Sequence, residues 1–315
     1  MNNLIVVLGG RGRLGTALIN HLSESIDDSI ISVDRLSLDT SSLANIDLVY
    51  DINEKALINK LEELSQNKKI IVINASGLQH SNYTKDIEIS NLLSPIQFIK
   101  NMRNSNLNFF FVHISSISVA HGNDIHPKLG EGNPINYYGL TKLKFESFLS
   151  RFMPNNSFIV LRPGAFYGKS YSNKNFDKFL NLIKRGIFIF PFKKRYRSYT
   201  NIDTIFSAIQ IIINEIKEES KLICKISNIT DMKPLSTLDL FIEFKEKKKH
   251  KFPPVFFPSI IFKILSRVNF FVEKRLKIHI GFLTMFAEQG YDFNGDIDQF
   301  FKDKKILRYE TNFEY

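Results

Sequence analysis

The sequence is poor in cysteine, in tryptophan and in long apolar runs. Its 315 residues contain one cysteine, Cys224, and no tryptophan. A single thiol excludes an internal disulfide and a metal site built on cysteines, and it fits a reducing compartment. No uninterrupted apolar run reaches the roughly 18 residues that a membrane-spanning helix requires. The short apolar run near the N-terminus also lacks the basic leader of a signal peptide. We therefore expect a cytoplasmic protein with no stable membrane insertion.

The composition nevertheless limits the class of protein. Hydrophobic residues make up 43% of the sequence, which is normal for a globular protein with a large core. The formal net charge is +10, with basic clusters at 193–197 and 245–251. Such a charge suits nucleic acid, a membrane surface or an anionic small molecule. Because no nucleic-acid-binding motif accompanies either cluster, we expect a small-molecule substrate and no nucleic-acid partner.

Tyr138 and Lys142 form the pair around which the rest of the sequence is organised. Four residues apart on a helix, their side chains share one face. A phenol normally ionises near pH ~10, and an adjacent ammonium favours the phenolate and lowers its pKa. The pair therefore suits proton transfer at an alcohol while a hydride moves at its carbon. An isolated pair of this spacing is more typical of an ordinary helix surface, so the surrounding motifs decide.

The first of these motifs is a glycine-rich turn that follows a short apolar run, residues 4–8. Gly9, Gly12 and Gly15 have the G-x-x-G-x-x-G spacing, and residues 16–22 predict a helix. Strand, glycine turn and helix together are the context of a dinucleotide-binding loop. The first glycine permits the tight turn, the second lets the backbone approach a pyrophosphate, and the third lets the helix pack on the strand. Amides at the helix N-terminus then face the phosphates. The loop also contains Arg11, Arg13 and Leu14.

An acidic residue, Asp34, ends the next expected strand, residues 29–33. A carboxylate at this place accepts hydrogen bonds from the adenosine ribose hydroxyls and favours NAD. Arg35 follows directly, and two more arginines lie in the glycine loop. An arginine near that ribose can instead accommodate the 2′-phosphate of NADP. Since Asp34 repels a phosphate unless the arginines outweigh it, we expect NAD, with NADP as the alternative.

Two further motifs complete an order that is typical of one family. Ser115-Ser116 follows the apolar run 108–114, and residues 162–168, with the sequence RPGAFYG, follow the run 157–161. With the glycine turn and the Tyr/Lys pair, in this order and at these spacings, they resemble the extended short-chain dehydrogenase/reductase family, in its NAD-dependent epimerase/dehydratase group. The resemblance covers nearly the whole chain.

The resemblance implies a fold of the α/β class. We expect a Rossmann-type doubly wound parallel sheet with a smaller C-terminal substrate lobe. Residues 1–168 would form the dinucleotide-binding domain, to which later segments return. Residues 169–315 would form mainly the substrate-binding lobe.

The resemblance also implies which residues act. Tyr138 would exchange the proton, Lys142 would lower its pKa and bind the nicotinamide ribose, and Ser116 would position the reacting oxygen. In the resembling enzymes an arginine placed like Arg197 reaches the substrate diphosphate, and its planar fork suits phosphate oxygens. The substrate-binding set is Ser116, Ser118, Tyr138 and Arg197. The cofactor-binding set is Gly9, Arg11, Gly12, Arg13, Leu14, Gly15, Asp34, Arg35, Asp51, Ile52, Asn74, Ala75, Ser76, Tyr138, Lys142, Pro163 and Ala165.

Two more polar residues are candidates for supporting roles. Asn91 matches a position where the family often has asparagine, and there it would support the helix backbone and a proton-relay water. A surface asparagine is the equal alternative. His80 follows the fourth strand and faces either the active site or solvent.

The reaction stays open between two classes. Family members that remove water from a hexose usually carry an acidic pair directly after the catalytic hydroxyl residue, where this chain has Ile117 and Ser118. A 4,6-dehydratase is therefore disfavoured. An epimerase retains its cofactor and a reductase releases it, yet both use the same triad. The expected substrate is a nucleotide-diphosphate sugar, and the alternative is another hydroxy or keto compound, for example a steroid-like one.

Other expectations are more general. A non-catalytic dinucleotide-binding sensor is the hypothesis from another functional class, and the intact triad argues against it. We expect no metal, since no cluster of histidine and carboxylate residues has ligand spacing. A homodimer is expected from the family resemblance alone.

The stretch 252–286 is the part for which the sequence predicts least. Prolines and charges interrupt its apolar residues. One prediction is a helix packed on the substrate lobe through Phe256, Phe257, Ile260, Ile261 and Leu265. The alternative is a peripheral membrane or partner contact, favoured by Lys263, Arg267, Lys274 and Arg275.

Overall fold

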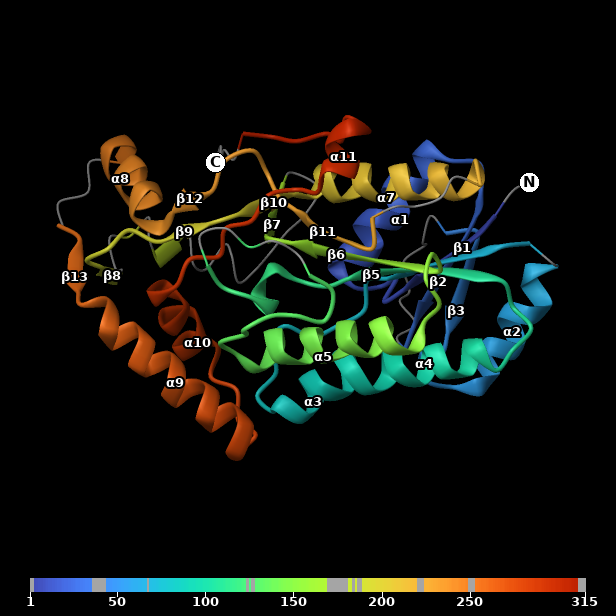
Figure 1. The fold of residues 1–315 in the computed structure, drawn as a ribbon, viewed down its shortest axis with the longest axis horizontal. Coiled ribbons are helices and arrows are strands. Elements are labelled where there is room, and N and C mark those ends of the chain that lie inside the picture. The colour runs from blue at the N-terminus through green and yellow to red at the C-terminus, as the bar shows by residue number, and fades with distance from the viewer. Residues whose placement is uncertain are drawn as a thin grey trace.

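Figure 1 shows the computed structural model of the chain, with a central sheet between layers of helices and a smaller group of elements at one end. The structure describes residues 3–35, 44–66, 68–122, 125, 128–168, 181–182, 185, 189–219, 224–248 and 253–310. Seven strands lie in the order β11-β6-β5-β4-β1-β2-β3, and every neighbouring pair is parallel. The expected Rossmann-type fold is confirmed. The strands are β1 (Leu4–Leu8), β2 (Ser29–Asp34), β3 (Ile46–Val49), β4 (Ile70–Asn74), β5 (Phe109–Ile114), β6 (Phe158–Pro163) and β11 (Ile226–Ile229).

The strand order reverses at β1, which pairs with β2 on one side and with β4 on the other. In open parallel sheets a crevice forms outside the carboxyl ends of the strands at such a switch point. The glycine loop follows β1, and Ala75 and Ser76 follow β4. The topology therefore brings these two predicted cofactor segments to the same crevice.

Alternate side chains of β1 belong to two separate cores. Ile5 and Val7 pack with the residues of α1 and α7, whereas Val6 and Leu8 pack with those of α2, α4 and α5. All four side chains have no exposed surface. A strand covered on both faces must be apolar on both faces, which is why residues 4–8 lack alternation. The helices of these layers are α1 (Arg13–Ser25) and α7 (Ile202–Lys217) on one face, and α2 (Lys55–Ser65), α3 (Thr84–Glu88), α4 (Ser94–Arg103) and α5 (Tyr137–Phe152) on the other (Figure 1).

The predicted element boundaries differ from the observed ones by a few residues. The sequence of residues 53–66 predicts an amphipathic helix, and the structure has α2 there, Lys55–Ser65. The sequence also predicts a strand at 223–227, and the structure has β11 at Ile226–Ile229; residue 223 lies outside the described part of the chain. Short apolar runs do not show where a strand begins, because its hydrogen-bond partner sets the register.

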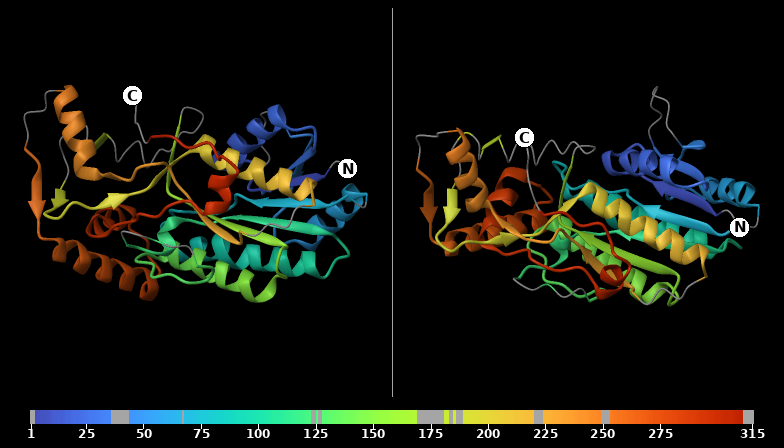
Figure 2. Two further views of the ribbon diagram at one scale, coloured as in Figure 1. Left: turned by 45° about the horizontal axis from the view of Figure 1, so that its top comes forward. Right: turned by 90° about the horizontal axis from the view of Figure 1, so that it is seen from above.

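The smaller group of elements lies beyond one end of the sheet, as the two further views in Figure 2 also show. Its strands pair two by two, with β7 on β10, β9 on β12 and β8 on β13. A separate small core contains Phe190, Tyr199, Leu240 and Phe241. The elements are β7 (Ala165–Tyr167), β8 (Ile189–Pro191), β9 (Tyr196–Arg197), β10 (Tyr199–Asn201), β12 (Leu235–Ser236), α8 (Thr237–Lys248), β13 (Val255–Phe257), α9 (Ser259–Arg275) and α10 (Gly281–Ala287).

The predicted packing of the stretch 252–286 is wrong in detail. Phe256 and Phe257 belong to a strand, β13, and not to the helix. Ile260 and Ile261 lie on α9 but are 57% and 38% exposed, so they do not pack on the lobe. The predicted helix is present as α9, but a different face of it is buried. Residue 252 lies outside the described part of the chain.

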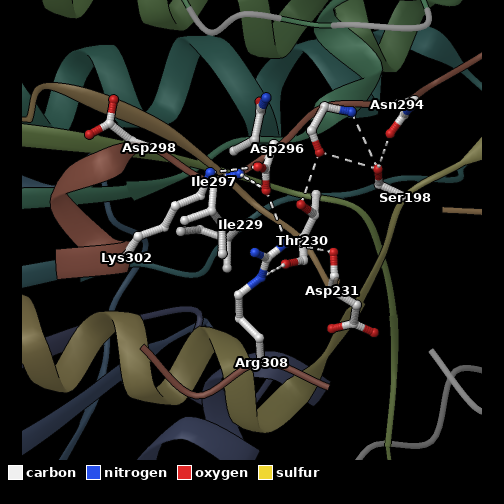
Figure 3. Close-up of polar contacts among 12 residues, drawn as sticks. Ser198, Ile229, Thr230, Asp231, Asn294, Asp296, Ile297, Asp298, Lys302 and Arg308 are labelled. Atoms are coloured by element: carbon white, nitrogen blue, oxygen red, sulfur yellow. Dashed lines mark hydrogen bonds and ion pairs between the residues drawn. The ribbon is translucent and has the colours of Figure 1, made fainter. Parts of the chain in front are cut away.

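The C-terminal segment fastens the smaller group to the sheet, as the polar contacts in Figure 3 show. The guanidinium of Arg308 donates to the carbonyl oxygen of Asp231 over 2.9 Å and to the Asp296 carboxylate over 3.0 Å. The hydroxyl of Ser198 donates to the Asn294 side-chain oxygen over 3.2 Å. Ser198 directly follows the arginine predicted to bind substrate. The contacts therefore fix that arginine relative to the carboxyl end of β11. The helix α11 (Gln299–Asp303) follows within the same segment.

Candidate functional site

One cleft at the switch point contains most of the predicted cofactor residues. At Gly9 the backbone φ is +77°, a conformation that favours glycine. A Cβ at Gly15 would stand 2.1 Å from the carbonyl oxygen of Gly9, so the helix could not approach the turn with any other residue. The described lining is Gly9, Arg11, Gly12, Asp34, Arg35, Asp51, Ile52, Ala75, Ser76, Gly77, Leu78, Asp86, Ile89, Ser90 and Ser94.

Asp34 and Arg11, which both line this cleft, are linked to each other. The backbone amide of Arg11 donates to the Asp34 carboxylate over 3.1 Å. The Arg11 guanidinium lies 2.7 Å from the carboxylate of Asp47 on the neighbouring strand. The sequence did not predict Asp47, because only the pairing of β2 with β3 places it there. A carboxylate partner offsets much of the charge with which Arg11 could attract a further phosphate.

Three of the predicted cofactor residues have other surroundings in the structure. Leu14 packs against the core between α1 and the sheet. Asn74 is fully buried, and its side-chain oxygen accepts hydrogen bonds from the amide and hydroxyl of Ser76 over 3.2 and 2.5 Å. Arg13 is the first residue of α1 and is not among the residues that line the cleft. Leu14 and Asn74 therefore shape the segments that line it.

A second cleft contains the predicted catalytic serine and tyrosine. It is open to solvent and has a cavity volume of about 140 Å³. The predicted residues Ser116, Ser118, Tyr138 and Arg197 all line it, as do the four residues 163–166 of the RPGAFYG motif. In the part of the chain that the structure describes, the residues that line this cleft are Gln79, Ser115, Ser116, Ile117, Ser118, Tyr138, Pro163, Gly164, Ala165, Phe166, Arg197, Ser198, Glu288 and Phe293.

The two adjacent serines differ in what their hydroxyls bind. The hydroxyl of Ser115 donates to the buried carboxylate of Glu146 over 2.5 Å. Glu146 also forms an ion pair with Arg162, with 2.5 and 3.0 Å between the paired atoms, and both side chains are at most 1% exposed. Ser116 instead accepts a hydrogen bond from the amide of Ser118 over 3.1 Å. The hydroxyl of Ser115 is thus already bound to the buried ion pair. Ser116 is therefore the better placed of the two serines to bind a ligand.

The N-terminus of α5 is held against the strand end that carries these serines. Asn136 caps the helix by accepting from the amide of Gly139 over 2.7 Å. A Cβ at Gly139 would stand 2.2 Å from the carbonyl oxygen of Ser118. Only glycine therefore allows this close approach, and Tyr138 lies one residue before it.

Lys142 lies one turn further along α5 and is buried, with 3% of its surface exposed. Its ammonium donates to the carbonyl oxygen of Ile114 over 2.9 Å and lies 6.0 Å from the centre of the Tyr138 ring. Burial lowers the pKa of Lys142 to about 8, and the carboxylate of Glu146 opposes that shift. Desolvation disfavours the charged form of an amine, which is the physical cause. The structure thus brings the Tyr/Lys pair together on one face.

Asn91 supports a loop that passes over Lys142. It lies in a π-helical turn, Ile89–Leu93, and is 1% exposed. Its side chain exchanges two hydrogen bonds with the backbone of Leu78, over 2.8 and 2.9 Å. A Cβ at Gly77 would stand 3.3 Å from the Lys142 ammonium. The alternative of a surface asparagine is therefore wrong, and the backbone it supports is that of the loop 77–79.

Arg197 has a partner that the sequence did not indicate. Its guanidinium lies 2.9 Å from the carboxylate of Glu288 and 4.9 Å from the centre of the Phe293 ring. The other carboxylate oxygen of Glu288 accepts from the side-chain amide of Asn136, the cap of α5, over 2.7 Å. The Nη2 atom of Arg197 is shielded from solvent and has no hydrogen-bond partner among the described residues. One nitrogen of the guanidinium therefore lacks a protein acceptor in that part of the chain, and Arg197 as a residue lines the cleft.

The cleft residues that sequence reasoning missed are Gln79, Glu288 and Phe293. Glu288 is 91 residues from Arg197 in the chain, so only the fold brings the two together. A polar residue in a helical turn gives no local signal of such a contact. Gln79 could have been predicted from its place beside Leu78 in the loop that follows the fourth strand, because such loops line the cleft.

Comparisons with known proteins agree with this architecture. The model of the NAD dependent epimerase/dehydratase family matches residues 5–223, which is more than half of the chain. The chain therefore belongs to the NAD dependent epimerase/dehydratase family. No curated protein matched the sequence significantly.

Similar solved structures include several sugar-nucleotide epimerases. UDP-glucuronic acid 4-epimerase from Bacillus cereus, in complex with UDP-glucuronic acid and NAD, has a TM-score of 0.63 and 18% identity over 81% of this chain and 86% of that one. UDP-glucose 4-epimerase from Thermotoga maritima, with UDP-glucose, has a TM-score of 0.57 and 16% identity over 96% and 99%. ADP-L-glycero-D-manno-heptose-6-epimerase from Helicobacter pylori has a TM-score of 0.58 and 20% identity over 81% and 85%. At these identities the likeness shows the fold.

Proposed function

We propose that this protein is an epimerase that inverts a secondary alcohol of a nucleotide-diphosphate sugar, with Ser116, Tyr138 and Lys142 as its triad. The observation that carries the proposal is the single cleft lined by Ser116, Tyr138 and Arg197, with the buried Lys142 beside the tyrosine. The similar structures include epimerases in complex with UDP-glucuronic acid or UDP-glucose, which supports this substrate class.

The residues divide the work of moving a proton at the reacting oxygen. Tyr138 takes the alcohol proton as a phenolate and returns it as a phenol. The ammonium of Lys142 stabilises the phenolate. It thereby lowers the pKa of the Tyr138 phenol toward neutral pH. The Ser116 hydroxyl donates to the same substrate oxygen and fixes its orientation. A bound NAD would accept the hydride from the substrate carbon and then return it.

NAD is the dinucleotide that the residues of the first cleft fit. The turn at Gly9 and the close contact at Gly15 leave the cleft without side chains where a pyrophosphate would approach, and the N-terminus of α1 faces it. Asp34 lines the ribose end. Arg11, the arginine nearest to it in the glycine loop, is paired with Asp47, which weakens the case for a 2′-phosphate. We therefore propose NAD over NADP.

An experiment separates an epimerase from the reductase alternative. The protein is purified without added cofactor and denatured, and the released small molecules are identified by mass spectrometry. An epimerase retains NAD, so we expect NAD in the supernatant at close to one equivalent. A protein that is empty but binds and releases a reduced dinucleotide reversibly would instead be a reductase.

Arg197 provides a second prediction. Replacing Arg197 with Leu should raise KM for a nucleotide-diphosphate sugar by roughly 10- to 100-fold, because a hydrogen bond to a charged group contributes about 1.5–3 kcal/mol. Cofactor binding should not change, since Arg197 lies in the other cleft. Arg197→Lys keeps the charge and loses the fork, so an intermediate KM is expected. An unchanged KM in Arg197→Leu would remove the arginine from the substrate site.

The pH dependence of kcat/KM provides a third prediction. Lys142 loses its charge as the pH rises through about 8, the value to which burial lowers its pKa. We expect kcat/KM to fall above that pH, because the ammonium no longer favours the phenolate. In Lys144→Met the fall should be unchanged, since Lys144 is an exposed lysine of the same helix.

Unfolding does not explain such a fall. Between pH about 8 and the ordinary lysine value of 10.5, the unfolded chain binds more protons at this residue than the folded chain does. The contribution of Lys142 to stability therefore rises with pH in this window, while activity falls. A profile that stays level from pH ~7 to pH ~10 would contradict the role of the buried ammonium.

A further inference from the structure

The helix α9 has its polar side buried and its apolar side exposed, which is the reverse of an ordinary surface helix. Its buried residues are Phe262, Ser266, Asn269 and Glu273, of which three are polar and all are at most 2% exposed. A surface helix of a globular protein normally turns its apolar side inward and its polar side to water. Here the polar side chains face the protein.

Each inward polar side chain makes at least one hydrogen bond. The Glu273 carboxylate accepts from the backbone amide of Tyr137 over 2.8 Å and from the His279 ring over 2.7 Å. The amide of Asn269 donates to the Thr284 hydroxyl over 3.1 Å. Buried polar groups with such partners fix the rotation of a helix about its own axis. The opposite face of α9 is therefore held toward solvent.

That outward face consists of apolar and basic side chains. The exposed apolar residues of the helix are 38–62% exposed, and they are Ile260, Ile261, Ile264, Val268 and Phe271. Further exposed apolar residues precede the helix in the chain, namely Val255, Phe256 and Phe257, and others follow it, namely Leu276, Ile278, Ile280 and Phe282. Exposed apolar surface of this extent normally marks a contact with a partner or a membrane.

Within the segment 253–282 the exposed charges have a single sign. Arg267, Lys274 and Arg275 are exposed on α9, and Lys277 follows it. Between residues 253 and 282 the sole acidic residue in the sequence is Glu273, which is fully buried. A second copy of the chain, related by a two-fold axis, would bring basic face against basic face. The charge instead fits an extended anionic surface into which apolar side chains can enter.

We propose that β13, α9 and the segment up to residue 282 dock on an anionic lipid bilayer. The helix lies parallel to the bilayer, with its apolar side chains in the boundary between headgroups and acyl chains and its arginines and lysines at the lipid phosphates. None of the described helices is both long enough and apolar enough to cross a membrane. In Figure 1 these elements form the edge of the molecule farthest from the N-terminal strands, so the sheet does not obstruct this contact.

Docking would also connect the bilayer with the catalytic helix. Glu273 on the inner face of α9 binds the amide of Tyr137, the first residue of α5. The next residue of α5, Tyr138, lines the cleft that also contains Ser116. Bound in this way, the enzyme would work next to the lipid surface.

Vesicle flotation with the full chain tests the proposal. Vesicles of phosphatidylcholine alone are compared with vesicles that also contain phosphatidylglycerol, at low and at high salt. We expect binding to the anionic vesicles only, and less of it at high salt. Arg267→Gln with Arg275→Gln should weaken binding by roughly 25-fold, at about five-fold for each charge near the surface.

Apolar substitutions supply the matched comparison. Ile264→Ser with Phe271→Ser should abolish most of the vesicle binding. Met232→Ser with Leu307→Ser removes two similarly exposed apolar side chains elsewhere and should leave it unchanged. Bound NAD in each variant shows that the fold is intact, and a failure to hold NAD in the wild type would count against the proposed function and not against the docking face.

Three results would overturn the docking proposal. One is the absence of binding to anionic vesicles. Another is equal loss in the two pairs of apolar variants. The third is that the wild type does not bind vesicles, while Ile264→Ser with Phe271→Ser changes the oligomeric mass. That result would assign the face to contact with a second copy of the chain.

Discussion

Replacing Tyr138 with Phe should lower kcat by about 10²- to 10⁴-fold, the usual contribution of a general acid or base. The ring would still fill its place at the N-terminus of α5, and only the hydroxyl that lies at the cleft would be lost. NAD should therefore still be retained. The measurement is turnover of a nucleotide-diphosphate sugar, together with the amount of dinucleotide released on denaturation.

The neighbouring tyrosine offers a matched control. Tyr137 donates its hydroxyl to Glu88 over 2.9 Å and does not line the cleft. Burial and the Glu88 carboxylate raise its pKa to about 12, which is too high for proton exchange near neutral pH. Tyr137→Phe should therefore keep most of the activity. Equal activity in the Tyr138 variant and the wild type would refute the mechanism.

Replacing Gly12 with Val should abolish NAD binding and leave the fold in place. Gly12 has φ −70° and ψ 160°, which any residue can adopt, and a Cβ there would meet only the Gly9 carbonyl oxygen, at 3.1 Å. The larger side chain would intrude into the cleft that Gly12 lines and displace a pyrophosphate from the amides at the N-terminus of α1. Each charge-assisted hydrogen bond lost costs about 1.5–3 kcal/mol, so loss of two weakens binding by at least roughly 100-fold.

Gly12→Ala is the graded control for this variant. A single methyl group at that position has one close neighbour, so a smaller loss of affinity is expected. The melting temperature of all three proteins, measured without dinucleotide, should agree closely. A valine variant that folds and still retains NAD would contradict the assignment of the loop.

The sequence was sufficient wherever a local motif determines local structure. The run 4–8 and the glycine spacing after it specify a buried strand and a turn, because no other arrangement accommodates those residues. The Tyr/Lys spacing likewise specifies one helix face. These motifs place the two clefts, and the parallel sheet that connects them follows from the alternation of strands and helices.

The sequence was insufficient wherever distant segments meet. The pairing of Arg197 with Glu288, and of Arg162 with Glu146, depends on the tertiary fold and has no local signal. The rotation of α9 differs from the sequence prediction for a related reason. The sequence predicts that its apolar residues face the core, but the buried hydrogen bonds of Asn269 and Glu273 hold the opposite, polar face inward.

The most direct test of the central claim is the analysis of nucleotide-diphosphate sugars after incubation with the pure protein. UDP-glucose, UDP-glucuronic acid and other sugars of the class are incubated without added dinucleotide, and products are analysed by mass spectrometry and by NMR of the ring protons. We predict that one of them yields a stereoisomer of unchanged mass, and that Tyr138→Phe yields none. If the protein retains NAD and yet converts none of these sugars, or if the Tyr138 variant converts them equally well, the claim is contradicted.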